Sequence, residues 1–364
     1  MIRSRLVLAL AMLVAIAATL SAAIAVEAAG RAPRAGSAEA SALPKLLSGT
    51  GLYADGSTRM VRPQNIAFSP QYPLWSDGTQ KRRWIYVPPG TAVDASQPDV
   101  LAFPPGTKLW KEFSHAAPVE TRLTERLADG SWRIATYVWN DDGRDATLAP
   151  AEGIASVAAP GAPGGRYAIP SRTDCLACHE GGAVPVLGFS ALQLSRDRDP
   201  LAPHAEPKPP GDADLADLVA RGTIRKLPAA LVESAPRIFS ASDVERAALG
   251  YLHGNCGHCH NASGAVAGID LVLAQRAGDP RASARETLAA LVGRDSRFRS
   301  HGNGAAARVV PGNAQHSVVA ARMRSTNPMT RMPPLGVTVV DDTGLALVER
   351  WINEYLQPQT EKQP

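Results

Sequence analysis

The sequence predicts an α+β protein in which an N-terminal all-β, sandwich-like domain is followed by a mainly α-helical region. Two observations favour this order. Between residues 45 and 170, short runs rich in aromatic and branched residues alternate with clusters of Pro, Gly, Asp and Ser, as strands alternate with turns. After residue 170, apolar residues recur at helical spacing, and long connections separate them.

The β domain, residues 45–170, contains four predicted strands. They are Lys81–Val87, Thr107–Phe113, Val119–Leu127 and Trp132–Trp139. The segment Ala128-Asp129-Gly130-Ser131 between the last two predicts a hairpin turn. Most of the tryptophans fall in this domain, and we interpret them as core residues rather than as a platform for a ligand.

Three helices are predicted in the second half of the chain. Asp212–Arg221 and Ser242–His253 have apolar residues three and four apart. The last helix, Asp342–Leu356, has one apolar face, and acidic residues at its start are favoured as caps. The proline-rich, charged stretch Arg196–Pro210 is predicted to be a loop.

The pattern Cys-x-x-Cys-His occurs twice and uses all of the cysteines. The residues are Cys175, Cys178 and His179, then Cys256, Cys259 and His260. This pattern is the attachment site of a c-type haem. Cysteines three residues apart share one face of a helical turn, so both thiols can reach the vinyl groups of one porphyrin. The histidine that follows becomes the proximal iron ligand. We therefore predict two covalently bound haems c as cofactors.

Other uses of paired cysteines fit this chain less well. Four-thiolate zinc sites usually have their two cysteine pairs roughly 15–20 residues apart, and these pairs are much further apart. A thioredoxin-like redox pair needs a βαβ setting and no histidine after the second cysteine. Two disulfides remain geometrically possible in an exported protein. The repeated histidine favours haem.

The N-terminus indicates export. Arg3 and Arg5 precede the apolar run Leu6–Leu20 and small-residue cleavage candidates, so residues 1–28 are predicted to be a signal peptide and 29–44 a disordered lead-in. The location predicted is periplasmic or otherwise exported. The uncharged stretch Leu6–Val26 would reach across a membrane only if it stayed uncleaved. The formal net charge of +4 and the lack of a basic run favour no nucleic-acid partner.

Residues 240–358 resemble a monohaem cytochrome c domain. The likeness is carried by Gly250-Tyr251, the second Cys-x-x-Cys-His motif, Met332-Pro333-Pro334 and a final helix with Trp351 at its centre. Val310-Pro311-Gly312-Asn313, followed by Ser317 and Arg322, is similar to the variant fused to or paired with bacterial sugar dehydrogenases. We therefore predict a cytochrome c-like domain with the second haem at 239–364. The first motif predicts a haem-binding segment at 171–238.

The mature chain as a whole is similar to a family of exported bacterial haem proteins whose function is undefined. The motifs are Tyr72-Pro73-Leu74-Trp75-Ser76-Asp77-Gly78, Glu120-Thr121-Arg122-Leu123 and Tyr137-Val138-Trp139-Asn140. This likeness implies a β domain ahead of the haem domains and no particular reaction. Together the two resemblances suggest a dihaem c-type cytochrome.

The distal iron ligands differ between the two predicted haems. The cytochrome c resemblance implies Met332 for the second haem, with Met329 and Met323 as competitors. No methionine lies between Met60 and Met323, so the first haem is expected to use a histidine. The candidates are His115, His204, His253, His301 and His316. We choose His115, just after a predicted strand, with His204 next.

These expectations favour an electron-transfer protein whose partner is a redox protein, a dehydrogenase or an oxidase. The alternative is a dihaem enzyme or sensor, peroxidase-like or gas-binding, with an open site at the first haem. The absence of a methionine near the first motif supports that alternative. A secreted β binding module with haems as redox anchors is a third class.

Overall fold

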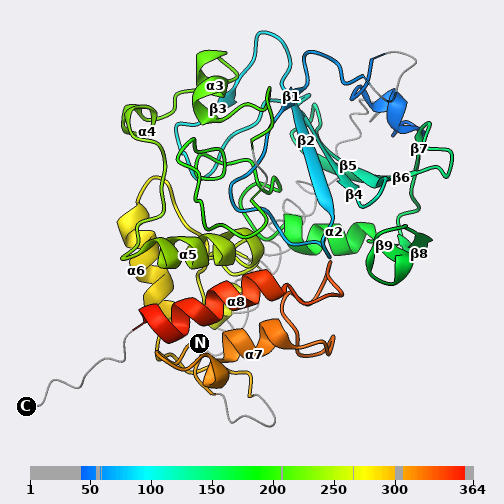
Figure 1. Ribbon diagram of the computed structural model, residues 1–364. Coiled ribbons are helices and arrows are strands. Elements are labelled where there is room, and N and C mark those ends of the chain that lie inside the picture. Colours follow the sequence, from blue (N-terminus) through cyan, green and yellow to red (C-terminus); the bar gives the residue numbers. More distant parts are fainter. Residues whose placement is uncertain are drawn as a thin grey trace, which may run out of the picture. The chain divides into compact units, whose positions relative to one another are not determined.

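The computed structural model describes residues 42–54, 58, 60–205, 208–264, 266–299 and 306–356. The predicted signal peptide, most of the predicted lead-in and His301 lie outside these residues. Within them, no helix is both long enough and apolar enough to cross a bilayer. Residues Leu43–Pro364 form one unit, with a large sheet and a group of helices (Figure 1).

The large sheet has six antiparallel strands in the order β1-β2-β4-β5-β6-β7. Its strands are β1 Ile66–Ala67, β2 Gln80–Tyr86, β4 Lys108–Ser114, β5 Pro118–Arg126, β6 Trp132–Trp139 and β7 Ala146–Leu148. The four predicted strands agree with β2, β4, β5 and β6 to within one residue at each end. The predicted hairpin joins β5 to β6, which pair in antiparallel register.

The two faces of the sheet are covered by different parts of the chain. Successive residues of a strand point to opposite faces. On one face, Trp84, Trp110 and Leu123 are cross-strand neighbours and pack against residues of the N-terminal segment. This segment contains the 3₁₀ turn η1, Leu47–Thr50. On the other face, Ile85 and Leu109 belong to the core that the sheet shares with the helices.

The observed β structure differs from the predicted sandwich, although the α+β class is confirmed. The remaining described strands form two-stranded ribbons: β3 Val93–Asp94 with β10 Ile224–Arg225, and β8 Ile154–Ala158 with β9 Arg166–Ile169. The sheet face that carries Trp84 and Trp110 is covered by the mostly irregular N-terminal segment, and not by a second large sheet. Alternation along the strands predicts a two-faced sheet but not what covers each face.

The helices follow the sheet in the sequence. They are α2 Arg172–His179, α3 Leu215–Ala220, α4 Ala229–Glu233, α5 Asp243–Asn255, α6 Pro280–Leu291, α7 Val318–Arg324 and α8 Asp342–Arg350. Short turns lie among them: η2 Pro163–Gly165, η3 Ala267–Ile269 and η4 Ala314–His316, with η5 Trp351–Tyr355 continuing α8. Of the predicted helices, α3, α5 and α8 with η5 are confirmed. Asp341 caps α8 by accepting from the Gly344 N–H at 2.9 Å.

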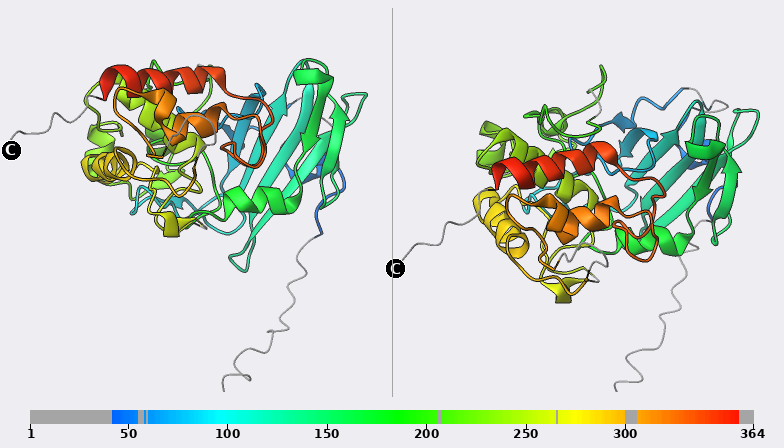
Figure 2. Two further views of the ribbon diagram at one scale, coloured as in Figure 1. Left: turned by 90° about the horizontal axis from the view of Figure 1, so that it is seen from below. Right: turned by 60° about the horizontal axis from the view of Figure 1, so that its bottom comes forward.

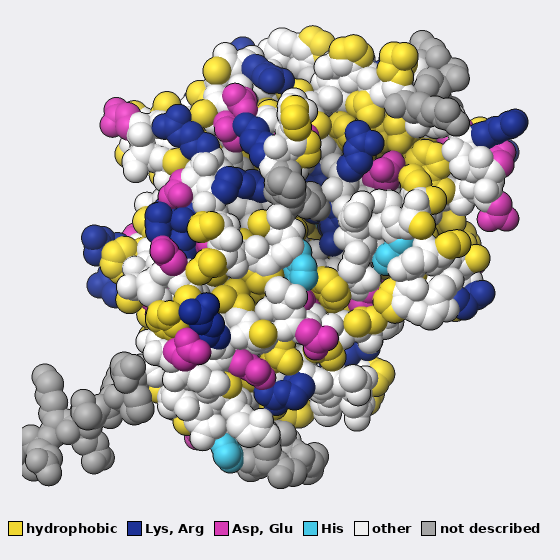
Figure 3. Space-filling view, viewed as in Figure 1, with side chains coloured by type: hydrophobic (Ala, Val, Ile, Leu, Met, Phe, Trp, Pro, Cys, Tyr) yellow, Lys and Arg dark blue, Asp and Glu magenta, His cyan; other side chains and the backbone are white. Residues whose placement is uncertain are grey.

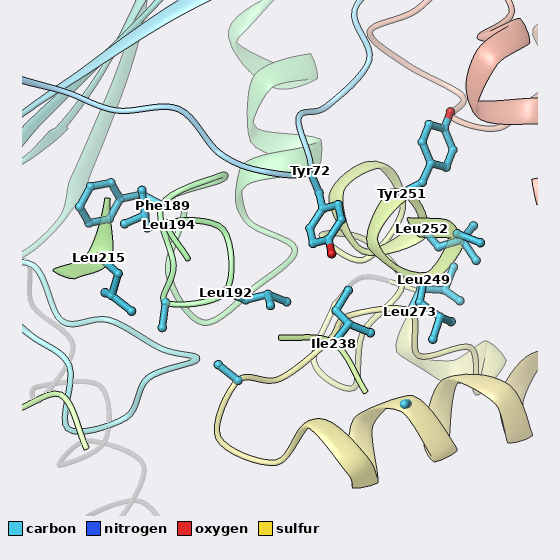
Figure 4. Close-up of a cluster of buried hydrophobic side chains, with 14 of the residues drawn as sticks. Tyr72, Phe189, Leu192, Leu194, Leu215, Ile238, Leu249, Tyr251, Leu252 and Leu273 are labelled. Carbon is cyan, nitrogen blue, oxygen red and sulfur yellow. The ribbon is translucent and has the colours of Figure 1, made fainter. Parts of the chain in front are cut away.

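Helix α5 joins the sheet side of the core to the C-terminal helices. Glycines allow this close packing: a Cβ at Gly250 would lie 2.0 Å from the ring of Tyr72, and one at Gly344 of α8 would lie 2.2 Å from the ring of Tyr251. Figure 4 shows Tyr72 between the loop of Phe189 to Leu194 and helix α5. The helix that leads into the second motif is therefore fixed from both sides.

Candidate haem attachment sites

The first motif lies on helix α2, which packs against β6 of the large sheet (Figure 2). Ser171 begins this helix with a capping box: its hydroxyl accepts from the Asp174 N–H, and the Asp174 carboxylate accepts from the Ser171 N–H at 3.0 Å. Such reciprocal capping stabilises a short helix that packing alone would hold weakly. Cys175 is buried, while Cys178 and His179 are half-buried in the last turn.

The His179 imidazole is held by a backbone carbonyl. Its Nδ1 lies 2.8 Å from the carbonyl oxygen of Pro185, to which it can donate a proton. Metal-binding histidines commonly use one ring nitrogen in this way, which leaves the other nitrogen for the metal. Burial, helped by Lys111 and Arg122, lowers the pKa of His179 to about 4, so the ring is neutral at pH 7.

A cavity of about 620 Å³ opens beside the first motif. Cys175, Cys178 and His179 line it from α2, and the loop Arg331–Thr338 contributes further lining. Leu109, Thr124 and Ile134 line it from the sheet. Ligand cavities in proteins span roughly 300–1,000 Å³. Two thiols, a neutral imidazole with one anchored nitrogen and a cavity of this size fit a covalently attached haem.

The second motif begins where α5 ends. Cys256 is the C-cap residue, and the His260 N–H donates to the Cys256 carbonyl oxygen at 2.8 Å. Burial raises the pKa of Cys256 to about 12 and, with Arg322, lowers that of His260 to about 4. The Nδ1 of His260 is buried without a hydrogen-bond partner in the described part of the chain. The thiols and the neutral imidazole of this motif also fit a covalently attached haem.

The two motifs lie in direct contact, although the sequence separates them widely. The Sγ atoms of Cys178 and Cys259 and a ring nitrogen of His258 all lie within 4.8 Å of one another. The Cys178 thiol donates to Cys259, which lowers the pKa of Cys259 to about 7 and raises that of Cys178 to about 12. One cysteine of each motif therefore reaches the same point.

Asn261 and Gly181 hold this contact together, and the motif analysis missed both. The Asn261 side-chain amide donates to the carbonyl oxygens of Gly181 at 2.8 Å, His258 at 3.0 Å and Gly257 at 3.1 Å. A Cβ at Gly181 would lie 2.2 Å from the His258 carbonyl oxygen. Only a glycine fits between the two backbones at this point.

A small metal ion is the competing occupant of this contact. Thiolates and imidazole are ligands that zinc accepts, and the sequence separation that disfavoured zinc does not prevent these three residues from meeting. A structural zinc site, however, has four ligands in nearly all cases. Cys175 and Cys256 are not part of the cluster, so the thiols do not form a four-thiolate site.

Met332 lies in the loop that lines the first cavity, and it faces a separate small cavity. That cavity measures about 20 Å³, is lined also by Tyr251 and Met323, and is far too small for a porphyrin. The Met332 N–H donates to the Arg322 carbonyl oxygen at 3.0 Å, and Arg322 lowers the pKa of His260. The competitor Met329 is 85% exposed. The role of Met332 as an iron ligand remains a prediction.

The loop that carries Met332 is held by the turn at Trp75-Ser76-Asp77. The Asp77 carboxylate accepts from the Thr338 N–H at 2.9 Å, the Thr338 hydroxyl at 2.6 Å and the Val339 N–H at 3.0 Å. The Trp75 indole donates to the Val339 carbonyl oxygen at 3.1 Å, and the Trp75 N–H donates to Asn255 of α5 at 2.7 Å. We call this arrangement the Asp77 clamp.

The histidines considered for the first haem are in different surroundings. His115 follows β4, with its ring centroid 6.1 Å from that of Tyr167 and its Nε2 buried without a partner in the described residues. Tyr167 lines the cavity, but His115 is not among the lining residues. His204 Nε2 lies 2.8 Å from an Asp341 carboxylate oxygen, and its ring lies against that of Trp75 with the two planes tilted by 36°. His253 accepts from the Gln275 N–H at 3.0 Å, and His316 is exposed.

His258, which was not among the histidines considered, does line the cavity.

Comparison of the chain with protein-family models, curated proteins and solved structures finds no match.

Proposed function

We propose that this protein is a periplasmic dihaem c-type cytochrome that carries electrons between redox proteins. The observation that carries the proposal is the contact between the two Cys-x-x-Cys-His motifs, with Cys178, His258 and Cys259 within 4.8 Å of one another. A porphyrin bonded to each motif would have one edge at this contact. Two redox centres side by side suit a protein that receives an electron at one site and releases it from the other.

The residues of the motifs have distinct roles in this proposal. The cysteine thiols would hold the porphyrin by thioether bonds, each formed by addition of S–H across a vinyl double bond, with no net oxidation. His179 and His260 would each offer a ring nitrogen to the iron, and the Pro185 carbonyl fixes the His179 ring. When bound, haem supplies reversible one-electron chemistry at its iron.

If Met332 and His260 both bind the second iron, the loop that the Asp77 clamp holds would have to move, because the cavity beside Met332 is too small for a porphyrin. A thioether opposite imidazole raises the reduction potential. With Met332 bound, the second site would therefore have the higher potential of the two, and electrons would pass from the first site to the second.

The external partner is proposed to be a dehydrogenase or an oxidase. Figure 3 shows positive and negative side chains interspersed over the face that it presents, so this face does not select a partner of one charge sign. Recognition would then depend on shape and on access to one haem edge.

A dihaem enzyme or gas sensor is the second candidate, and one observation favours it. The cavity beside the first motif is lined by no methionine, and His258 is its only histidine besides His179 among the described residues. An iron held by His179 could therefore keep its distal position open to peroxide, oxygen or another small ligand.

Two measurements test the proposal on the full exported chain. Intact mass of denatured protein should exceed that of the bare polypeptide by two haems, and a bare mass would overturn the proposal. Carbon monoxide added to the reduced protein should change the spectrum little if protein side chains occupy both axial positions of each iron. Ready binding of carbon monoxide at one haem would reject the electron-carrier proposal in favour of a dihaem enzyme or sensor.

A further inference from the structure

Three side chains that can bind a metal meet where the two motifs touch. Cys178 comes from the last turn of α2, and His258 and Cys259 come from the turn that follows α5. Their ligand atoms all lie within 4.8 Å of one another. In a tetrahedral zinc site, metal–sulfur bonds of about 2.3 Å and metal–nitrogen bonds of about 2.0 Å place the ligand atoms roughly 3.5–4 Å apart. The three ligand atoms are therefore close enough to share one ion after a small shift.

The backbone, and not the ligand atoms, holds the two segments together. The Asn261 side-chain amide donates to carbonyl oxygens of both segments, those of Gly181 and His258. A Cβ at Gly264 would lie 2.5 Å from the Cys259 carbonyl oxygen and 3.0 Å from that of Gly181, so the two backbones also pack closely here. A site that is arranged before its ligand arrives binds it more tightly, because less conformational freedom is lost.

The residue types in the cluster select the class of ion. Two sulfurs and an imidazole nitrogen suit zinc and copper(I), whereas calcium and magnesium need oxygen ligands. No carboxylate belongs to this group among the described residues. Three protein ligands leave one tetrahedral position open, as in zinc sites that keep a water there. Cys178 and His258 also line the 620 Å³ cavity, from which a water molecule can reach that position.

We propose that Cys178, His258 and Cys259 form a metal site that binds one zinc ion in the chain before haem is attached. The two thiols release their protons to the solvent and bind as thiolates, and the imidazole binds through a neutral ring nitrogen. No electron is transferred. This inference goes beyond the proposed function, because it concerns the same polypeptide in its haem-free state.

The metal ion and the haems compete for the same sulfur atoms. A thiolate binds a metal through its negative charge, and a sulfur that has formed a thioether bond has lost that charge. The ion takes one cysteine of each motif, Cys178 and Cys259. A bound zinc ion therefore blocks complete haem attachment at both motifs at once, and the ion must leave before the two haems can be attached.

The test is a zinc titration of the full chain, made without haem and kept reduced. Competition with a coloured zinc chelator gives the stoichiometry and the dissociation constant, and we expect one ion per chain. Cys178→Ser, Cys259→Ser and His258→Gln should each weaken zinc binding by at least about tenfold, because loss even of an outer-shell partner costs roughly 10–100-fold in metal affinity.

Each ligand variant has a matched control. Cys175→Ser and Cys256→Ser remove the other thiol of each motif, which lies outside the cluster, and His316→Gln removes an exposed histidine. These three controls should keep one zinc ion with unchanged affinity. Equal weakening in Cys175→Ser and Cys256→Ser would show a four-thiolate site instead, and a wild-type chain that binds no zinc would show that there is no site. Either result would overturn the proposal.

A second measurement uses only the wild-type chain, so it does not depend on whether each variant folds. The cysteines are alkylated with and without zinc, and mass spectrometry identifies the labelled peptides. Zinc should slow the labelling of Cys178 and Cys259 and leave that of Cys175 and Cys256 unchanged. Equal protection of all the cysteines, or protection of none, would contradict the proposed ligand set.

Failure of this inference can be told apart from failure of the proposed function. Intact mass and metal content are measured on the exported, mature chain. Two haems on the mature chain, with no zinc binding by the haem-free chain, would refute the inference alone. Zinc and no haem on the mature chain would refute the proposed function and leave the metal site in place.

Discussion

The two Cys-x-x-Cys-His motifs share a sequence pattern but not a setting. The first lies on the short, capped helix α2, beside a cavity of about 620 Å³, with His179 anchored on Pro185. The second follows the long buried helix α5, with the Nδ1 of His260 unpartnered within the described residues. The same sequence pattern thus lies beside a large cavity in one case and at the end of a buried helix in the other.

Removing each cysteine pair in turn should have the largest effect and should separate the contributions of the two motifs. Cys175→Ser with Cys178→Ser, and Cys256→Ser with Cys259→Ser, should each remove half of the covalent haem, because a thioether bond needs the thiol. Intact mass measures this loss. Cys256 packs against the helical core, so its variant should also unfold at a lower temperature than the first-motif variant. Variants that both keep two haems would contradict the assignment of the motifs.

Met332→Ala should lower the potential of one haem and abolish the near-infrared absorption of a sulfur-bound ferric iron. The physical reason is loss of the thioether that favours reduced iron. Met329→Ala is the matched control, since Met329 is 85% exposed only three residues away. If the band survives in Met332→Ala and disappears in Met329→Ala, the ligand assignment is wrong.

Asp77→Ala tests whether the sheet side of the molecule controls the second site. Loss of the Asp77 clamp removes hydrogen bonds to a charged acceptor, so we expect the free energy of unfolding to fall by about 2–3 kcal/mol. The absorption of the sulfur-bound iron should weaken as well. Asp77→Asn keeps one acceptor oxygen and should have a smaller effect, and Asp141→Ala, at an exposed turn, should have none. Chemical denaturation and the near-infrared spectrum measure both effects.

The smallest expected effect concerns the pH dependence of the stability that Asp341 contributes. Burial opposes ionisation of Asp341, but hydrogen bonds from His204, Gly344 and Tyr251 prevail and lower its pKa. The unfolded chain then binds this proton more readily, so the stabilisation is present above the ordinary carboxyl pKa of about 4 and is lost as pH falls. Asp341→Asn should flatten the acid side of a stability–pH curve, while Asp342→Asn should not. Parallel curves would contradict this account.

Local patterns predicted much of the fold. Strand ends agree to within one residue because alternation and turn residues act over a few positions, and the Asp341 cap follows from the same kind of local rule. Helix α6 was overlooked, although Asp279 as its N-cap and Pro280 in its first turn were a readable signal. The two Cys-x-x-Cys-His motifs, being contiguous, needed no structure to be found.

Long-range contacts were beyond the reach of those patterns. Asn261 is an ordinary polar residue until the fold places the Gly181 carbonyl beside it. Arg83, Lys111 and Arg122 become neighbours only once the register of three strands is known. His115 was chosen by its position after a strand, and the surfaces that line the cavity come instead from α2, the sheet and the Met332 loop.

The contact at Gly181 would have a kinetic consequence in the proposed dihaem protein. A methyl group at this position would meet the His258 carbonyl oxygen and push the motifs apart. The rate at which an electron tunnels between two centres falls exponentially with their separation. If each motif holds a haem, Gly181→Ala should therefore slow electron exchange between them, and the absence of a side chain at this one position would limit their separation.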